Sequence, residues 1–339
     1  MVGVKAIGWT FSPREWERWV EEKRESLYRA RQIWHWIWKK GVYNPAQMSD
    51  VPLSIRTALD SEVFFPMLEL VRSQESRDGT RKFLWALPEG GKVETVWIPH
   101  QNRYTVCISS QVGCSLNCRF CATGQLGLER QLKGYEILLQ VYAVKHLLGL
   151  PITNVVFMGM GEPLLNYSAV IEAVEGLTQR MGFSGKRLTI STVGIPKAIQ
   201  RLAERSEPFE LAFSLHSAIP EKRRALIPLA AHISLEELQT ALGLYCEKRN
   251  EWITLEYVLL EDINDQEADA EALREFIKPP LRAKVNLIEY NPVPELPFRG
   301  SRRIKDFQQA LLKRRIITTI RRSRGADIAA ACGQLSRRF

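Results

Sequence analysis

The chain lacks any run of apolar residues approaching the roughly 20 that are needed to span a bilayer. Its start, Met1–Trp9, lacks the basic start followed by a long apolar run that an export signal needs. Cysteine is scarce as well, and six cysteines in 339 residues are too few for a disulfide-rich secreted protein. These absences predict a soluble cytoplasmic protein that has no membrane partner.

The charge of the chain is concentrated at one end. Residues 301–339 carry 11 of the 47 Lys and Arg and two of the 38 Asp and Glu. Residues 1–300 therefore hold 36 charges of each sign and balance at zero. A basic surface confined to one end of a fold favours a polyanion such as nucleic acid. A solvated basic helix with counter-ions is the alternative.

The first 103 residues divide into two predicted parts. Residues 1–75 are expected to form a small helical accessory domain, in which Ser12 caps a helix that begins at Pro13. Six of the nine tryptophans lie within the first 38 residues. Most of them are expected to fill the core of this domain, with stacking on RNA bases as the alternative. Residues 76–103 are predicted to form a β-hairpin extension, with strands over 82–87 and 93–98.

From residue 104 to 300, strand and helix patterns alternate. Six β–α repeats imply parallel strands with right-handed crossovers, and six are too few for a closed eight-fold barrel. The count alone leaves open a doubly wound sheet or a partial (β/α)6 barrel. Strands are expected over 105–110, 154–158, 188–191, 210–215, 253–259 and 284–289, and helices over 135–148, 170–179, 196–204, 235–248, 267–276 and 304–314.

Three of the cysteines lie together with the spacing Cys-x3-Cys-x2-Cys. Cys114, Cys118 and Cys121 can occupy three corners of a [4Fe–4S] cluster, and an iron without a protein ligand leaves an open site for chemistry. Structural zinc is the main alternative, but it prefers a closed set of four ligands in pairs. No second Cys-x-x-Cys or His-x3-His pair exists to complete one. With Phe120 before the last cysteine, the segment resembles the signature of the radical S-adenosylmethionine (SAM) enzymes.

Polar residues follow several of the predicted strands. The cysteine loop comes directly after the first of these strands, and ligands of parallel α/β folds collect at the carboxyl ends of the strands. Glu162, in a glycine-rich turn, could pair with the ammonium group of an amino acid. The other segments expected at this edge are 159–163, 191–194, 214–216 and 291–292.

Four segments extend the resemblance over essentially the whole chain: 94–99, 110–122, 159–166 and 331–335. Together they are similar to the RlmN/Cfr family of radical-SAM RNA methyltransferases. The resemblance implies a partial (β/α)6 radical-SAM barrel over 104–300, an RNA-binding accessory domain over 1–75, and a basic C-terminal segment over 301–339. It also implies methylation of an adenine carbon in the peptidyl-transferase region of 23S rRNA. RlmN members act at C2 and many also modify the adenine next to the anticodon of certain tRNAs, whereas Cfr members act at C8.

The same resemblance assigns roles to two further cysteines and a carboxylate. Cys332 would take a methyl group from one SAM as a thiolate nucleophile. A 5′-deoxyadenosyl radical from a second SAM would remove a hydrogen from that methyl group, and the carbon radical would add to the adenine. Cys107 would release the adduct through a transient disulfide with Cys332, and Glu94 would accept a proton. Without the resemblance, each cysteine is predicted to be a small buried residue and Glu94 an ordinary strand carboxylate.

The resemblance also implies the cofactors and the partners. A [4Fe–4S] cluster and SAM are expected, with a flavodoxin or ferredoxin as electron donor and 23S rRNA, with tRNA as a second substrate, as the RNA partner. The remaining histidines (His35, His100, His146 and His232) and Cys246 are expected to be surface or packing residues. The residues expected to contact SAM are Gly161, Glu162, Ser191, Ser214, Leu215, His216 and Asn291.

Three other functions stay open at this point. A Cfr-like C8 methyltransferase would use the same machinery and differ only in the methyl position of the product. A different radical-SAM activity, such as an activase, would act on a substrate other than RNA. A non-catalytic iron–sulfur RNA-binding protein would bind RNA without cleaving SAM.

Overall fold

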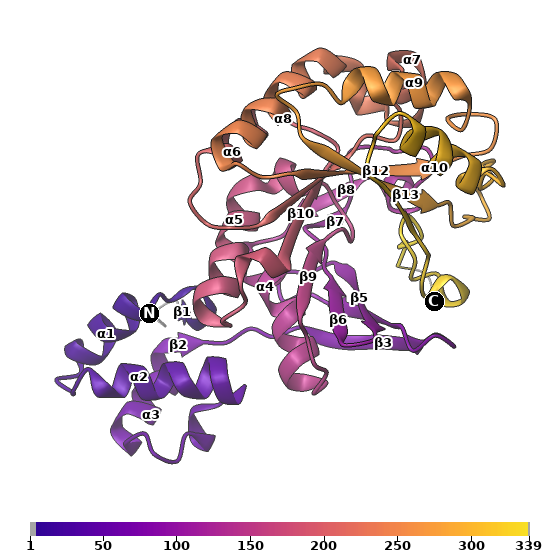
Figure 1. Cartoon of the computed structure of the whole chain (residues 1–339). Helices are drawn as coiled ribbons and strands as arrows, with labels where there is room; N and C mark the ends of the chain where they lie inside the picture. The colour runs from indigo at the N-terminus through magenta and orange to yellow at the C-terminus, as the bar shows by residue number, and fades with distance from the viewer. Residues whose placement is uncertain (1–4, 338–339) are drawn as a thin grey trace.

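The computed structural model describes residues 5–337, with the backbone alone at residues 230 and 231, and is built on one large sheet (Figure 1). The ten strands of this sheet run in the order β14-β13-β12-β11-β10-β9-β6-β5-β4-β3. The predicted domain ranges 1–75 and 301–339 begin and end in residues that lie outside the described part. Within that part, no helix is both long and apolar enough to cross a membrane.

Between residues 5 and 62 the chain forms three α-helices, namely α1 (Pro13–Glu22), α2 (Tyr28–His35) and α3 (Leu53–Glu62). As the sequence predicts, Ser12 caps α1, and the Glu15 side chain accepts a bond from the Ser12 N–H in return. A short parallel pair of strands, β1 (Ala6–Ile7) and β2 (Val63–Phe64), closes this unit.

Aromatic side chains fill the core of the helical unit and continue into the main body. Trp9 is fully buried, its indole N–H donates to Pro66 O at 2.7 Å, and its ring meets Trp38 and Tyr142. The Tyr142 hydroxyl in turn donates to Ile37 O at 3.0 Å. The tryptophans therefore serve packing, as expected for most of them, and they fix the helical unit against the barrel.

Three antiparallel strands extend the sheet on one side, β3 (Glu69–Glu75), β4 (Arg81–Ala86) and β5 (Lys92–His100). The β4–β5 hairpin lies where the sequence predicts it. The strand β3 lies within the range that was expected to be helical, and no strand was predicted there. Its residues are almost all exposed because β3 is the edge of the sheet, so it lacks the alternation of apolar and polar residues that marks a half-buried strand.

The parallel part of the sheet has seven strands, one more than the six repeats predict, and the helices form an arc around its outer side (Figure 1). The extra strand is β14 at the second edge, which is short and lies between arginine-rich segments. The strands are β6 (Arg103–Cys107), β9 (Asn154–Phe157), β10 (Leu188–Thr192), β11 (Glu210–Ser214), β12 (Ile253–Leu259), β13 (Ala283–Glu289) and β14 (Thr318–Arg321). The helices are α4 (Gly134–Tyr142), α5 (Tyr167–Glu175), α6 (Pro196–Ala203), α7 (Pro220–Leu226), α8 (Leu235–Arg249), α9 (Glu267–Phe276) and α10 (Ile304–Lys313). A separate hairpin pairs β7 (Gln111–Gly113) with β8 (Leu128–Gln131).

After β14, residues 325–337 fold back over the junction of the parallel and antiparallel strands, and we call them the Cys332 segment. The β3–β4 turn holds the start of this segment, where Gly325 N donates to Asp78 Oδ2 at 3.0 Å and Ser76 Oγ donates to Asp327 Oδ1 at 2.6 Å. Far from being a free basic tail, this part of the chain is packed against the sheet.

Replacing Trp9 by alanine tests the aromatic contact between the helical unit and the barrel. Trp9→Ala should lower the free energy of unfolding by about 3–5 kcal/mol, because a large buried ring and its hydrogen bond are lost. Urea denaturation followed by circular dichroism measures the change. Trp252→Ala is the matched control because Trp252 is 53% exposed. A loss no greater than that of the control would contradict the role of Trp9.

Candidate active site

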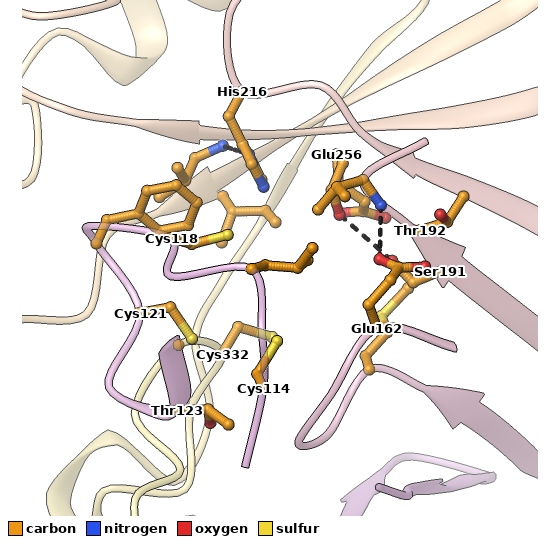
Figure 2. A pocket seen from close by; sticks show the side chains of 18 of the residues that line it. Cys114, Cys118, Cys121, Thr123, Glu162, Ser191, Thr192, His216, Glu256 and Cys332 are labelled. Atoms are coloured by element: carbon orange, nitrogen blue, oxygen red, sulfur yellow. Dashed lines mark hydrogen bonds between the residues drawn. The ribbon is translucent and has the colours of Figure 1, made fainter. Parts of the chain in front are cut away.

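A cavity lies at the carboxyl ends of the parallel strands, and we call it the first cavity (Figure 2). Figure 2 shows the three loop cysteines and Cys332 on one side and Glu162, Ser191 and Glu256 on the other. The edge of the sheet predicted from the sequence is therefore where these side chains meet. Of the predicted site residues, those that line this cavity are Cys114, Cys118, Cys121, Gly161, Glu162, Ser191, Ser214, His216 and Cys332.

The cysteine loop owes its tight course to two glycines. Gly113 has φ +79°, and a Cβ there would lie 1.9 Å from Gly127 O. A Cβ on Gly124 would lie 2.9 Å from the backbone N and O of Cys118. Bonds from Cys121 N to Cys118 O and from Gly124 N to Cys121 O, both 3.1 Å, then fold the loop into consecutive turns. The backbone rather than side-chain packing thus turns the thiols toward the cavity.

The loop thiols suit an iron–sulfur cluster. Burial raises the pKa of the Cys114 thiol to about 12, and burial together with Cys121 and Cys114 raises the pKa of Cys118 well above its usual value. Buried thiols in such mutual proximity ionise when a positively charged group binds them. Within residues 5–337, no three His, Cys, Asp or Glu side chains are grouped as ligands of a single metal ion. The loop offers three thiols and no fourth local ligand, a set that suits a cubane cluster with one open iron better than zinc, which prefers a closed set of four.

Glu162 forms the opposite wall of the first cavity. Its Oε1 accepts from Leu164 N and its Oε2 from Val193 N, both at 2.9 Å, which fixes the carboxylate in place. A Cβ on Gly161 would lie 2.5 Å from Gln111 Cβ, so the glycine permits this close turn. Burial raises the pKa of Glu162, which a cationic ligand in the cavity would counteract. A carboxylate fixed in this way suits the ammonium group of SAM.

His216 is neutral in this site. It has φ +56°, and its Nδ1 accepts a bond from Val258 N at 3.1 Å, so the second ring nitrogen carries the proton. Burial, with a contribution from Arg223, lowers the pKa of His216 to about 3. The imidazole edge also meets the Phe120 ring at 4.9 Å between centroids. His216 can therefore donate a hydrogen bond into the cavity over the whole physiological pH range.

Two predicted SAM contacts lie outside the lining of the first cavity. Leu215 is fully buried, and its backbone N–H donates to Glu256 O at 3.1 Å. Asn291 is buried as well, and its Nδ2 donates to Cys332 O at 3.3 Å. In this structure, Asn291 thus holds the Cys332 segment.

A second cavity adjoins the first, and Cys332 lies in the wall of both. Cys107 lines only the second cavity, and the charge of the nearby Cys332 adds to the effect of burial, which raises the pKa of the Cys107 thiol to about 12. Both thiols are free. Ala122 N donates to Gly333 O at 2.7 Å, which ties the Cys332 segment directly to the cysteine loop. The structure thus gathers five of the six cysteines at the junction of two cavities.

Glu94 lies outside the lining of both cavities. Its side chain is fully buried, and Lys82 Nζ lies 3.1 Å from its Oε1. Among the described residues, this ion pair is not accompanied by a hydrogen bond of good geometry to either carboxylate oxygen. Burial raises the pKa of Glu94, and Lys82 together with the backbone N–H groups of Arg337 and Ser336 opposes the rise.

Two arginines at the site have no counterpart in the sequence-based prediction. Arg223 on α7 is 2% exposed, and its Nη2 donates to Val193 O at 2.6 Å while Nε and Nη1 lack partners among the described residues. Burial lowers the pKa of Arg223 to about 10, and Cys118 partly offsets this. Arg321 on β14 lines both cavities, and the neighbouring Cys332 raises its pKa. Both positions read in the sequence as members of exposed basic runs, so no pattern marked them.

Cys246 and His146 are two of the residues that, with His35, His100 and His232, were expected to lie on the surface or to serve packing. Cys246 is fully buried on α8 and its thiol is 3.5 Å from Arg282 O, remote from both cavities. His146 packs on Tyr142 at 4.7 Å between ring centroids, and burial lowers its pKa to about 4. Both are packing residues, as expected.

Two family models match the chain. A model of the radical SAM superfamily matches residues 108–273, which include the cysteine loop. A model described as the ribosomal RNA large subunit methyltransferase N-terminal domain matches residues 9–64, which correspond to the helical unit.

Curated relatives and one solved structure match almost the whole chain. A protein of Solidesulfovibrio magneticus named dual-specificity RNA methyltransferase RlmN is 44% identical, over 92% of this chain and 91% of the relative. A protein of the same name from Syntrophobacter fumaroxidans is 42% identical, over 96% of each. The crystal structure of a radical SAM methyltransferase from Sphaerobacter thermophilus is 39% identical, covers 97% of this chain and 99% of its own, and superimposes with a TM-score of 0.91.

Alanine substitution of the loop cysteines tests the cluster assignment. Each of Cys114→Ala, Cys118→Ala and Cys121→Ala should reduce bound iron and sulfide to near background after anaerobic reconstitution, since three thiolates are needed to hold the cluster. Iron analysis and the visible charge-transfer absorption report the loss. Cys246→Ala, remote from the cavities, should retain the cluster. Full iron content in any of the three loop variants would remove that cysteine from the ligand set.

Proposed function

The chain belongs to the RlmN family of radical SAM enzymes, and we propose that it methylates C2 of an adenine in RNA. The proposed substrates are 23S rRNA in the peptidyl-transferase region and, as in the relatives named dual-specificity, the adenine beside the anticodon of certain tRNAs. The observation that carries the proposal is the position of Cys332 between the loop cysteines and Cys107, in the wall shared by two cavities.

The cofactors follow from the family and from the fit of the residues. Cys114, Cys118 and Cys121 would hold a [4Fe–4S] cluster, and Glu162, Ser191, Ser214 and His216 line the space proposed for SAM. When bound, the cluster supplies one electron and an open iron site, so that SAM can yield the radical that removes a hydrogen atom from a methyl group on Cys332. The protein residues bind, orient and shield these groups from water.

Cys332 is proposed as the carrier of the methyl group. Its sulfur would attack the methyl carbon of one SAM, so that a sulfur–carbon bond forms while the bond to the sulfonium breaks and S-adenosylhomocysteine leaves. Arg321 lies beside Cys332 in the wall of both cavities, and the neighbouring Cys332 raises the pKa of its guanidinium group. An adenine ring carbon is a poor nucleophile, so a carrier that delivers a carbon radical avoids direct transfer from SAM.

Cys107 is proposed to release the product from the enzyme. After the methylene carbon of Cys332 has joined the adenine, the Cys107 sulfur would bond to the Cys332 sulfur as the sulfur–carbon bond breaks. The electron pair of that bond stays with the methylene carbon, which takes up a proton to become the methyl group. A thiol reductant then restores both cysteines. Burial raises the pKa of Cys107, so the reaction requires access of a base to this thiol.

Glu94 is proposed to accept the proton that the adenine ring loses after the carbon radical has added, while the unpaired electron of the adduct would pass back to the iron–sulfur cluster that supplied one electron. The backbone of Ser336 and Arg337 covers this carboxylate, so the Cys332 segment has to move before an adenine can approach it. The movement would open the second cavity toward the face of the sheet that carries Cys107.

The RNA is proposed to contact the helical unit and the exposed basic residues near the C-terminus. Some arginines of residues 301–337 already form ion pairs within the protein. Arg314 pairs with Glu267 and Glu271, and Arg337 pairs with Glu129. The basic residues that remain exposed are Arg302, Arg303, Lys305, Lys313, Arg315 and Arg322. We further propose that a flavodoxin or ferredoxin supplies electrons and that the enzyme acts in the cytoplasm.

Nucleoside mass spectrometry tests the proposed function directly. The reconstituted protein, with SAM, a reductant and an unmodified 23S rRNA fragment, should produce 2-methyladenosine. Cys332→Ala should yield none while retaining its cluster. 8-Methyladenosine would assign the Cfr-type reaction, 5′-deoxyadenosine without methyladenosine would point to another substrate, and RNA binding without SAM cleavage would leave only a binding role. Methylated RNA from Cys332→Ala would disprove the carrier mechanism.

Substitution of Cys107 tests the release step. Cys107→Ala should accumulate protein covalently joined to RNA, since the sulfur–carbon bond to Cys332 has no thiol to break it. A denaturing gel with ribonuclease-treated samples detects the adduct. Cys246→Ala should show none. The absence of RNA-linked protein in Cys107→Ala would assign the release step to another group.

A further inference from the structure

Lys82 is a buried lysine that lines neither cavity and belongs to none of the motif segments. Its side chain is 1% exposed and that of Glu94 is 0% exposed. A lysine is almost never this deeply buried unless a partner compensates for the lost hydration. Its position next to the proposed proton acceptor suggests a role in the reaction or in its control.

The register of the strands places Lys82 on the face of the sheet that carries Cys107. Val96 of β5 lies opposite Lys82 of β4 on one side and opposite Cys107 of β6 on the other. Opposed residues point to the same face, and so do residues two apart along a strand. Glu94, two residues before Val96, therefore projects from the face that carries Lys82 and Cys107.

The ammonium group of Lys82 touches both this face and the segment that covers it. Its Nζ lies 3.1 Å from Glu94 Oε1 and donates to Ala329 O at 3.3 Å. Ala329 is three residues before Cys332. One cation thus contacts the proposed proton acceptor and the segment that bears the proposed methyl carrier.

The Cys332 segment has further anchors beyond this contact. Thr123 Oγ1 donates to Leu335 O at 2.5 Å, and Asn291 Nδ2 donates to Cys332 O. These bonds join the segment to the cysteine loop and to the loop that follows β13, whereas the bond to Lys82 joins it to the antiparallel extension. Lys82 is therefore placed to respond when the segment leaves the sheet.

We propose that Lys82 is a positioning residue for Glu94 and that it couples this carboxylate to the position of the Cys332 segment. The proposal rests on the proposed function, because it concerns the group that accepts the proton from the adenine. With the segment in place, the ammonium serves Ala329 O as well as Glu94. When the segment moves aside for the adenine, Ala329 O departs with it, whereas Glu94 stays beside the ammonium group, which keeps the carboxylate ionised and oriented.

The pH dependence of the reaction follows from the groups around Glu94. They are Lys82 on β4, the neutral Cys107 thiol on β6, and the backbone N–H groups of Ser336 and Arg337 in the segment. Burial raises the pKa of Glu94 and Lys82 opposes it, so removal of the ammonium raises the pKa further. A base must be ionised to act, so Lys82→Met should move the acid limb of the pH–rate profile to higher pH, and Lys82→Arg should restore it.

The first experiment follows the decay of the protein–RNA adduct in reconstituted holoenzyme carrying Lys82→Met or Lys82→Arg. Lys82→Met should methylate Cys332 normally but release RNA about tenfold or more slowly, so that adduct accumulates with Cys107 present. Lys92→Met, an exposed residue on β5, should behave as wild type. Release at the wild-type rate with an unshifted pH profile would overturn the positioning role.

A double-mutant cycle keeps the test decisive if the Lys82→Met protein fails to fold because Glu94 is buried without its partner. Glu94→Gln removes the buried charge, and the double variant Lys82→Met/Glu94→Gln should release RNA at the same rate as Glu94→Gln alone. Multiplicative effects of the two substitutions would show that Lys82 does not act through Glu94.

The coupling to the segment is tested without cofactor or RNA. In the cofactor-free full-length chain, iodoacetamide should alkylate Cys332 several-fold faster in Lys82→Met than in wild type or Lys92→Met, because the bond to Ala329 O is lost. Peptide mass spectrometry measures the rate at Cys332. An unchanged rate would overturn the coupling.

These readouts separate the inference from the proposed function. If the wild type forms neither adduct nor methyladenosine, the proposed function fails and the positioning role fails with it, while the alkylation contrast still decides the coupling. If the wild type is active and Lys82→Met matches it in every measurement, the inference alone is wrong.

Discussion

The structure depends on the packing of residues 325–337, which follow β14, against the face of the sheet that carries Cys107 of β6. Hydrogen bonds from the β3–β4 turn, the cysteine loop and Asn291 hold residues 325–337 there, and each of them joins parts of the sequence far from one another. This packing converts Cys332 from a residue near the chain terminus into part of the wall between two cavities. It also brings the backbone of Ala329 against Lys82 and that of Ser336 and Arg337 against Glu94. The active site is thus completed by long-range contacts rather than by any local motif.

Some of the buried charged side chains at the site have partners of opposite charge within the described part of the protein, and others do not. Lys82 and Glu94 neutralise each other, and loss of one partner from such a pair costs about 3–5 kcal/mol. Glu256 accepts a bond from Asn286 at 2.9 Å, and burial raises its pKa while Arg321 opposes the rise. Arg223 has no such compensation among the described residues, and its guanidinium lies near Cys118. A cluster of negative thiolates and sulfides would supply the compensating charge. The buried positive charge of Arg223 therefore agrees with the set of three thiols that the cysteine loop presents.

Sequence patterns predicted much of the fold because burial on both faces gives the parallel strands and their helices strong signals. They predicted neither β3 nor β14, since an edge strand can be polar and its pairing depends on the neighbouring strand. The cysteine spacing located the loop, and the resemblance supplied Glu94, Cys107 and Cys332. The cavity includes Gly161, Glu162, Ser191, Ser214 and His216 as predicted, whereas Leu215 and Asn291 lie behind its lining. Arg223, Arg321 and Lys82 could not be found in this way, because only tertiary packing distinguishes a buried cation from a solvated one.

The docking of the N-terminal helices has a consequence for the choice of RNA. The rings of Trp9 and Tyr142 are in contact, and Arg180, at the end of the π-helical turn Gly176–Arg180 that follows α5, donates to Trp9 O at 2.5 Å, so the helical unit packs directly against the barrel. The helical unit and the proposed methyl carrier Cys332 consequently lie at a defined distance from each other. An RNA that contacts both the helical unit and the site of Cys332 has to place its target adenine at that distance from the region that the helical unit binds. The enzyme would then recognise the folded shape of the RNA more than the nucleotide sequence around the target adenine.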